Sequence, residues 1–291
     1  MDGILIIDKP AGITSHDVVA RVRRTLKTKR VGHTGTLDPF ATGVMVILVG
    51  KATRLAQFLD KDEKEYEAVV RFGFETDTGD NTGSPKSEVQ GPMSIEIGQV
   101  DSALAKFRGT IMQTPPMYSA KKVEGKKLYE LARKGVEIER QSVKVNISDL
   151  VILDSAFRTP HSELRMRVAC SAGTYIRTLA EDVGREVGVG AHLTELRRTR
   201  AGKFKIDQAV TLDEVTESDL KPIELAVEHL PNFTLRDDRV SKTLNGMSTR
   251  DLSGTFTGGE QVRMTASTGE LVAIGFYDET EKVIQPKVVL G

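Results

Sequence analysis

Apolar runs alternate with turn-forming segments over the first 60 residues. Residues 3–8 (GILIID) are almost wholly apolar and stop at a Lys-Pro-Ala-Gly turn, which indicates a short buried strand. Apolar positions recur at helical spacing over residues 15–26, behind a Thr-Ser pair that can cap a helix. Residues 44–49 (VMVILV) form a continuous β-branched run, typical of a strand buried on both faces. Residues 52–59 are expected to be helical.

Strands and helices alternate irregularly in the middle of the chain. Residues 65–74 (EYEAVVRFGF) alternate as in a strand, and a polar loop rich in glycine and proline follows over residues 76–92. Residues 113–150 are expected to form a projecting insertion with a hairpin and a basic helix. The other expected elements are a helix at 100–107, strands near 143–153 and 163–171, and a helix from about 175 to 187. This order favours an α+β fold with a mixed, mainly antiparallel sheet over a doubly wound fold.

The pattern changes near Leu230-Pro231-Asn232. Beyond this point glycines punctuate short β-rich runs such as ELVAIGFY (270–277), which predicts a small β-barrel-like domain. A chain of 291 residues is long enough for one large domain and one small domain. We therefore expect one domain at 1–230 and a second at 231–291.

Composition narrows the class of protein. With 39% hydrophobic and 28% charged residues, the chain has the composition of an ordinary globular protein. Apolar runs are shorter than the ~18 residues of a membrane span, and no basic segment precedes the first run, so we expect a cytoplasmic protein without a membrane segment. Five scattered histidines and one cysteine have no ligand spacing for zinc. That cysteine, Cys170, lies on the apolar side of an alternating run, as a small core residue does.

Charge is distributed unevenly although the net charge is zero. Residues 211–291 hold 8 basic and 14 acidic side chains, so the rest of the chain carries a net +6. The positive charge is concentrated in three clusters, at 21–30, 121–134 and 196–205. Any one cluster can be a solvated helix face, but three together suggest binding of a polyanion such as nucleic acid.

One loop, GHTGTLDPFATG (32–43), has the composition of a functional site. Its glycines permit close approach of another backbone, Pro39 stiffens the chain, and Asp38 is its one acid. The alternative is a tight turn in which Asp38 only caps a helix or a turn. Local features alone leave both open.

The loop resembles the GHTGTLDPLATGVL signature of the TruB family of tRNA pseudouridine synthases. Five more segments are similar to family motifs in the same order, namely DKPAGITSHD (8–17), KEYEA (64–68), PPMYSAKKVEGKKLYELARKG (115–135), CSAGTYIRTLAEDVG (170–184) and GAHLTELRRT (190–199). Departures are apolar changes beside the loop: Phe40 where leucine is usual, and Met45-Val46 for a common Leu-Pro. The resemblance implies a pseudouridine synthase sheet with a C-terminal PUA domain, a small RNA-binding module, which the tail matches more weakly.

The same resemblance implies roles for the catalytic side chains. Asp38 would be the nucleophile, Arg177 would pair with Asp38 and keep it ionised, and the Tyr66 ring would stack on the uracil while its hydroxyl lies where a proton moves. The loop glycines would let RNA approach the backbone. Considered alone, a tyrosine such as Tyr66 is more often a strand residue half in the core, and an arginine such as Arg177 is more often on the surface of a helix. The reaction breaks an N–C glycosidic bond and rejoins the base through C5, so no cofactor or metal is expected.

Substrate-binding residues are also implied. Tyr175 and Leu196 would line the uracil pocket, and His33 would help to extrude the base. Without the resemblance, Tyr175 and Leu196 would be interpreted as core residues and His33 as a turn residue. Lys9 and Pro10 would support the site from below. The implied partner is tRNA, bound at the T loop, where uridine 55 is the target, and at the acceptor arm through the tail.

Two alternatives share the fold. A non-catalytic tRNA folding chaperone would be expected to lose Asp38 or Arg177, and both are present. An enzyme guided by a separate RNA would be expected to carry long basic extensions, which this chain lacks. No segment indicates an obligate dimer, so we expect a monomer.

Overall fold

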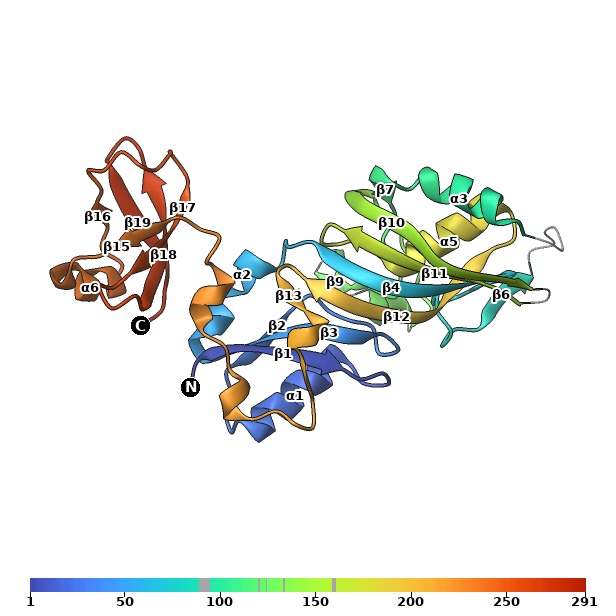
Figure 1. Cartoon of the computed structure of the whole chain (residues 1–291), viewed down its shortest axis with the longest axis horizontal. Helices are drawn as coiled ribbons and strands as arrows, with labels where there is room; N and C mark the ends of the chain where they lie inside the picture. The colour runs from blue at the N-terminus through green and yellow to red at the C-terminus, as the bar shows by residue number, and fades with distance from the viewer. Residues whose placement is uncertain (89–94, 120, 124, 133, 159–160) are drawn as a thin grey trace.

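A large mixed sheet forms the centre of the molecule (Figure 1). The computed structural model describes residues 1–88, 95–119, 121–123, 125–132, 134–158 and 161–291. The sheet has the order β14-β1-β3-β12-β4-β11-β10-β7, with β2 paired to β3 and β13 to β12. Two pairs, β1–β14 and β3–β12, are parallel and the others are antiparallel, which confirms the mixed, mainly antiparallel sheet. The strands are β1 (Gly3–Lys9), β2 (Val31–Thr34), β3 (Thr42–Val49), β4 (Lys64–Phe72), β7 (Gly109–Gln113), β10 (Val143–Arg158), β11 (His161–Cys170), β12 (Ala191–Ala201), β13 (Phe204–Lys205) and β14 (Val210–Thr211).

The strands β3 and β4 have the burial that their apolar patterns in the sequence predict. Strand β3 is buried along seven of its eight residues, as its continuous apolar run predicts. Strand β4 alternates buried and partly exposed positions, so one face packs into the core and the other faces outward. The buried face of β4 joins the largest apolar cluster, beneath α3 (Ile97–Ala105) and α5 (Ile176–Val187). The other half of the sheet is covered by α1 (Ser15–Thr25), which Thr14 caps.

Two segments differ from the sequence-based expectation. Residues 52–59 are a 3₁₀ helix (Gly50–Leu55) followed by one turn of α-helix, α2 (Ala56–Leu59). The Thr53 hydroxyl donates to the Gly50 carbonyl (2.8 Å), which favours the tighter turn. Residues 76–92 are not wholly a loop, because β5 (Phe74–Thr76) and β6 (Pro85–Glu88) pair as a hairpin; residues 89–94 lie outside the described residues.

The insertion contains the expected hairpin and helix, β8 (Lys122–Val123), β9 (Lys126–Lys127) and α4 (Leu128–Ala132). It ends earlier than expected, because residues 143–150 belong to β10 and pair with β7 and β11 in the central sheet. The side chains of Lys126 and Lys127 in the basic cluster 121–134 lie outside the described part of the chain.

A second, curled sheet lies at one end of the molecule (Figure 1). Its order is β15-β17-β18-β19-β16, and its strands are β15 (Asn232–Thr234), β16 (Thr249–Arg250), β17 (Gln261–Thr265), β18 (Leu271–Asp278) and β19 (Val283–Val289), with α6 (Asp237–Leu244) beside them. The sheet has an apolar cluster of its own. Leu271, Ile274 and Leu290 also belong to an apolar cluster that includes Ile4 and Leu48 of the central sheet. Among the described residues, no helix combines the length and the apolar character that spanning a bilayer requires.

Candidate active site

The loop that carries Asp38 connects β2 to β3 and is fixed from below. Lys9, which is fully buried, donates its Nζ to the carbonyls of Pro10 (3.0 Å), Pro39 (3.2 Å) and Ala41 (2.7 Å). Burial lowers the pKa of Lys9 to about 8. Two carbonyls shortly after the acid, and one in the turn after β1, are thus tied to one ammonium group, which restrains the backbone that follows Asp38.

Two positions of the loop require glycine because another strand of the protein approaches them closely, which the sequence did not suggest. Gly43 has φ +101°, and a Cβ there would lie 2.2 Å from the Arg198 carbonyl oxygen of β12. Gly35 has φ +69°, and its Cβ would lie 3.3 Å from the Arg198 guanidinium. Both glycines therefore make room for β12 inside the protein, whereas we expected the loop glycines to make room for RNA.

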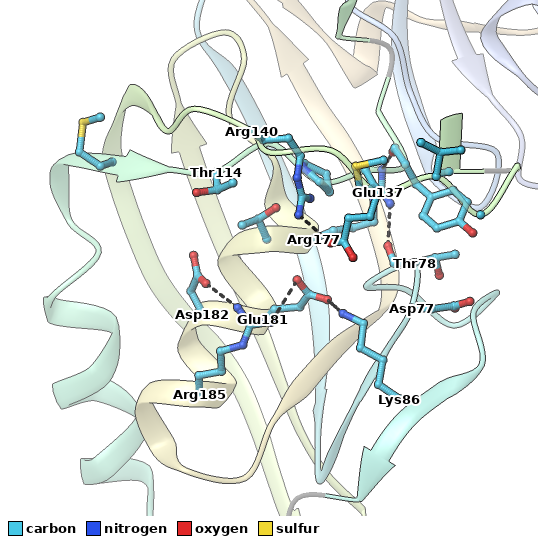
Figure 2. Close-up of a pocket in the computed structure, with 18 residues that line it drawn as sticks. Asp77, Thr78, Lys86, Thr114, Glu137, Arg140, Arg177, Glu181, Asp182 and Arg185 are labelled. Atoms are coloured by element: carbon cyan, nitrogen blue, oxygen red, sulfur yellow. Dashed lines mark hydrogen bonds and ion pairs between the residues drawn. The ribbon is translucent and has the colours of Figure 1, made fainter. Parts of the chain in front are cut away.

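A buried arginine holds the carboxylate of Asp38. Arg177, the second residue of α5, is 4% exposed and donates to both carboxylate oxygens, with Nε–Oδ2 at 2.9 Å and Nη2–Oδ1 at 3.2 Å. Its other N–H groups donate to the carbonyls of Thr78 (2.6 Å) and Tyr118 (2.7 Å). Figure 2 shows the bond to Thr78. One side chain therefore connects the Asp38 loop, the β5–β6 hairpin and the insertion.

The connection between β5 and β6 adds a second acid that the sequence analysis missed. Asp80 is 4% exposed, and its Oδ2 lies 3.8 Å from Arg177 Nη1. Its Oδ1 accepts hydrogen bonds from the Thr78 hydroxyl (2.8 Å) and from the backbone N–H and hydroxyl of Thr82 (3.0 and 2.5 Å). The Asp-Asn-Thr-Gly sequence is a signal for this turn, but nothing local connects it to Arg177.

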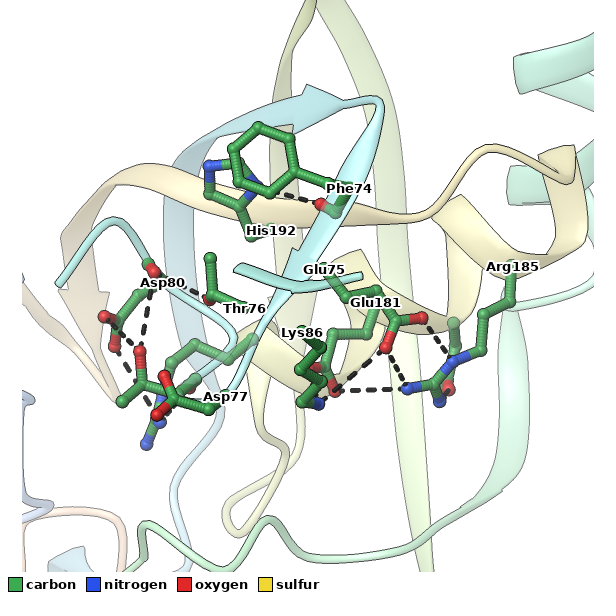
Figure 3. Close-up of polar contacts among 12 residues, drawn as sticks. Phe74, Glu75, Thr76, Asp77, Asp80, Lys86, Glu181, Arg185 and His192 are labelled. Carbon is green, nitrogen blue, oxygen red and sulfur yellow. Dashed lines mark hydrogen bonds and ion pairs between the residues drawn. The ribbon is translucent and has the colours of Figure 1, made fainter. Parts of the chain in front are cut away.

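Charged pairs hold the same hairpin against α5 (Figure 3). Arg185 donates to both oxygens of Glu75 (2.6 and 2.8 Å), and Lys86 lies 3.3 Å from Glu181 and 3.7 Å from Glu75. Burial alone would raise the pKa of Glu75, but its bonds to Arg185 and Lys86 leave it lowered. The hairpin, and with it Asp80, therefore keeps a fixed position relative to the helix that carries Arg177.

The acid–base state of Asp38 reflects opposing effects. Burial raises the pKa of Asp38 and Asp80 adds to this, whereas Arg177 and Lys9 act in the opposite direction. We expected Arg177 to keep Asp38 ionised; the arginine does act in this sense, but burial outweighs it. The side chain is still 35% exposed, so the carboxylate is open to a substrate. A carboxylate with a raised pKa is a stronger base and nucleophile once it is ionised.

A cavity of about 220 Å³ opens in front of the carboxylate. Five of the six residues assigned to the site line it, namely Asp38, Tyr66, Tyr175, Arg177 and Leu196. Tyr66 comes from β4 and Leu196 from β12, while Tyr175 precedes α5 and is held through its backbone by the buried Gln113 (2.8 and 3.1 Å). Burial raises the pKa of Tyr66 and of Tyr175, so both hydroxyls stay protonated at neutral pH. The cavity is smaller than the ~300–1,000 Å³ of drug-sized sites and suits one nucleobase.

The sixth residue, His33, does not line this cavity. It lies on β2, with its ring edge against that of His16 at 5.9 Å between centroids. Burial, followed by the charge of His16, lowers the pKa of His33 to about 4, so its ring is neutral at physiological pH. His33 therefore has a neutral, half-buried ring outside the cavity that contains Asp38.

Two buried cations in the cavity wall were also missed. Arg198 of β12 is 1% exposed and Lys64 of β4 is 5% exposed. Lys64 donates to the carbonyls of Asp60 (2.8 Å) and Asp62 (2.6 Å), and burial lowers its pKa. Arg198 was counted in the basic cluster 196–205 and Lys64 appeared only within the KEYEA segment, because local sequence does not show that a cation turns inward.

Most basic side chains of the cluster at 196–205 already have partners within the chain. Arg198 is buried, and the other basic residues with acidic partners are Arg197 with Asp8 (2.7 Å), Arg200 with Glu63 (2.6 Å) and Lys203 with Glu228 (2.5 Å). This cluster is thus not the free cationic surface that its composition suggested.

A larger cavity of about 600 Å³ lies on the other side of Arg177 (Figure 2). It lies between α5, the insertion and the β5–β6 hairpin, and its charged lining mixes both signs, with Lys86, Arg140 and Arg185 beside Glu137, Glu181 and Asp182. Among the described residues, no three His, Cys, Asp or Glu side chains come together as metal ligands do. The smaller cavity, with a fixed carboxylate and two tyrosines, is the place where covalent or acid–base chemistry on a single base can occur.

Comparison with known proteins identifies the family of the chain. Residues 23–176 match the family model of the TruB family pseudouridylate synthase N-terminal domain, and residues 177–228 match that of the tRNA pseudouridylate synthase B C-terminal domain. The tRNA pseudouridine synthase B of Bacillus pumilus is 41% identical over all of this chain and 98% of its own length. That of Symbiobacterium thermophilum is 47% identical over 85% of this chain and 83% of its own length.

Solved structures show the same fold. A chain in a Cbf5–Nop10–Gar1 complex is 28% identical, with a TM-score of 0.74, and the match covers 99% of this chain and 85% of that one. A chain of an H/ACA RNP bound to a substrate RNA containing 2′-deoxyuridine is 26% identical, with a TM-score of 0.72 and the same coverage. Fold and site together define an RNA-modifying isomerase of the pseudouridine synthase class. Within that class, the chain belongs to the TruB family of pseudouridylate synthases and acts on tRNA.

Proposed function

We propose that this chain converts uridine 55 in the T loop of tRNA to pseudouridine, with Asp38 as the nucleophile on a flipped-out base. The main support for this proposal is the two-point contact between Asp38 and the buried Arg177. This contact lies at the mouth of a cavity the size of one base. The relatives at 41% and 47% identity are named as tRNA enzymes, which favours a stand-alone tRNA enzyme over an RNA-guided one.

The reaction needs only what these side chains supply. The N1–C1′ bond breaks, a C5–C1′ bond forms, the proton on C5 is lost and N1 gains one, so the product is an isomer of the substrate. An ionised Asp38 can add to C6 of the base or to C1′ of the sugar, or can take a proton from C2′. Tyr66 supplies a ring against which uracil stacks, worth roughly 1–3 kcal/mol, and a protonated hydroxyl in the cavity.

Substrate binding requires a flipped base. Extruding a T-loop uridine costs a few kcal/mol, which contacts to phosphates offset. We assign Tyr175 and Leu196 to the walls around the uracil and His33 to the RNA outside the cavity, where its neutral ring helps to displace the base. Lys9 and Pro10 act as a support beneath Asp38 rather than in the chemistry.

The curled C-terminal sheet is assigned to the tRNA acceptor arm, as a PUA-like module of a monomeric enzyme. Residues 211–291 carry a net charge of −6, so this contact depends on shape and hydrogen bonds more than on charge.

The test of the proposed function is direct. A tRNA transcript is incubated with the protein, labelled with a carbodiimide that adds to pseudouridine, and mapped by mass spectrometry. We expect one label, at position 55. Binding without any label would favour the chaperone alternative, and a label elsewhere would refute the proposed target.

The pH dependence of the reaction follows from the state of Asp38. Because the ionised form is required, the single-turnover rate should fall as pH falls through the raised pKa of Asp38. Arg177→Lys removes the two-point contact, so the pKa of Asp38 should rise further and the acid limb should move to higher pH. Rate–pH profiles of both proteins check this, and an unmoved limb in the variant would show that Arg177 does not control Asp38.

Phosphate contacts should appear in the salt dependence of binding. Arg24 and Lys29, exposed in the basic cluster 21–30, are replaced together by glutamine. If both contact phosphates, the slope of log affinity against log salt should flatten by roughly 1.5, at ~0.7–0.9 per phosphate, while the modified uridine stays the same. Lys106→Gln, which removes a lysine paired with Glu186, is the control. An unchanged slope in the double variant would show that this cluster faces solvent.

Truncation tests the domain boundary. A chain cut after Leu230 should stay folded by circular dichroism and still modify tRNA, because the central sheet keeps three apolar clusters. Its thermal midpoint should fall, since the cut exposes apolar surface that Leu271, Ile274 and Leu290 cover. Binding should weaken. An unfolded fragment would show that residues 1–230 are not an independent domain.

A further inference from the structure

Arg198 is a buried cation whose charge is not balanced by an acidic partner among the described residues. It is 1% exposed, and no acidic side chain of the described residues forms an ion pair with it. Its Nε donates to the Val44 carbonyl (2.7 Å) and its Nη2 to the Gly35 carbonyl (3.0 Å). A fully buried guanidinium that is neutralised by no carboxylate is costly to the folded state. Retention of such a charge at the cavity wall requires a reason.

The nearest functional group is the hydroxyl of Tyr66. Arg198 and Tyr66 are directly opposite each other in the antiparallel pair β12–β4, so their side chains project from the same face of the sheet. Both line the cavity that contains Asp38. The Arg198 guanidinium is near enough to act on the pKa of Tyr66, in the direction opposite to burial. A guanidinium has only donors, so in a hydrogen bond between the two side chains the tyrosine oxygen accepts.

We infer that Arg198 is a positioning residue for Tyr66: it occupies the acceptor side of the hydroxyl, so that Tyr66 presents its O–H to the base as a hydrogen-bond donor. Tyr66 then stabilises the negative charge that develops on the uracil as the N1–C1′ bond breaks, without losing its proton. This inference rests on the proposed function and assigns a direction to one hydrogen bond within it.

The surroundings support a donor rather than a base. Burial raises the pKa of Tyr66, which keeps the hydroxyl protonated throughout the physiological range. Lys64 is a further buried cation in the same wall, two residues from Tyr66 along β4. Fixed donors and positive charge around a site where negative charge develops are what electrostatic stabilisation of a transition state requires.

A double-mutant cycle tests the coupling. The single-turnover rate at saturating enzyme is measured for the wild type, Arg198→Lys, Tyr66→Phe and the double variant, with thermal midpoints to confirm folding. Arg198→Lys should slow the step roughly tenfold in the wild type, but less than about twofold when Tyr66 is already phenylalanine. Losses that multiply would show that Arg198 only holds the loop through Gly35 and Val44, and would overturn the inference. Arg71→Lys, on the outward face of β4 and paired with Glu163, is the control.

A second measurement needs no change at Arg198 and so does not depend on that variant folding. Tyr66 is replaced by 3-fluorotyrosine, whose hydroxyl is a better donor and a poorer base. Below the pKa of that hydroxyl, an unchanged or higher rate supports the donor role, and a lower rate overturns it. Failure of the proposed function is distinct from both outcomes, because the wild type itself would then make no pseudouridine.

Discussion

Asp38→Asn should abolish pseudouridine formation while tRNA affinity stays within roughly tenfold, about 1.4 kcal/mol. The amide has nearly the shape of the carboxylate but cannot add to the base or the sugar or accept a proton from C2′. The change also leaves Arg177 without its two-point partner; among the acidic side chains of the described residues, Asp80, at 3.8 Å, remains near its charge. We therefore expect a lower thermal midpoint as well, but by less than the ~3–5 kcal/mol typical of a fully buried pair, because the Asp38 side chain is 35% exposed.

This prediction is tested by single-turnover assays on protein purified free of the wild type. Asp38→Ala accompanies the Asn variant, because alanine cannot revert to aspartate by deamidation. Asp213→Asn, an exposed acid paired with Arg21, is the control and should keep full activity. Turnover by a folded Ala variant would refute Asp38 as the nucleophile.

Tyr66→Phe should lower the single-turnover rate on the order of 10²-fold or more, with tRNA binding nearly intact. Phenylalanine keeps the ring for stacking and fits the same buried place on β4, but it removes the hydroxyl that we infer Arg198 to position. Tyr66→Leu should lose stacking as well and bind the flipped base less well.

The two variants separate the functions of the ring and the hydroxyl. Rates come from single turnover with excess enzyme, and affinities from equilibrium binding. Tyr277→Phe, a buried tyrosine of the curled sheet, controls for loss of a hydroxyl elsewhere. A Tyr66→Phe rate equal to that of the wild type would leave Tyr66 as a stacking surface only.

Local pattern was enough to predict most of the fold. The apolar runs of β1 and β3, the alternation of β4 and the helical spacing of α5 depend on neighbours in the chain, and each lies where its pattern predicted. Secondary structure was predicted incorrectly at two segments where side-chain contacts determine the path of the backbone. The segment after β4 forms a hairpin tied down by Asp80 and Glu75, and residues 50–55 tighten to a 3₁₀ helix around Thr53.

The sequence allowed site residues to be proposed only where they lie in segments that resemble family motifs. Asp38 stands out within its loop, and resemblance supplied its partners. Arg198 and Asp80 were missed because their roles depend on contacts distant in sequence: Arg198 meets Gly35 across 163 positions, and Asp80 meets Arg177 from another element. A run of basic residues does not reveal that one of them turns inward, so the cluster at 196–205 was interpreted as surface charge.

The proposed reaction rejoins one T-loop uridine through C5. It can be followed on tRNA transcripts whose uridines carry tritium at C5, because that hydrogen is lost only where the new C5–C1′ bond forms. We expect one equivalent of tritium released per tRNA, and none from a transcript in which uridine 55 is replaced by cytidine. Release from the cytidine transcript, or no release from either, would contradict the proposed reaction.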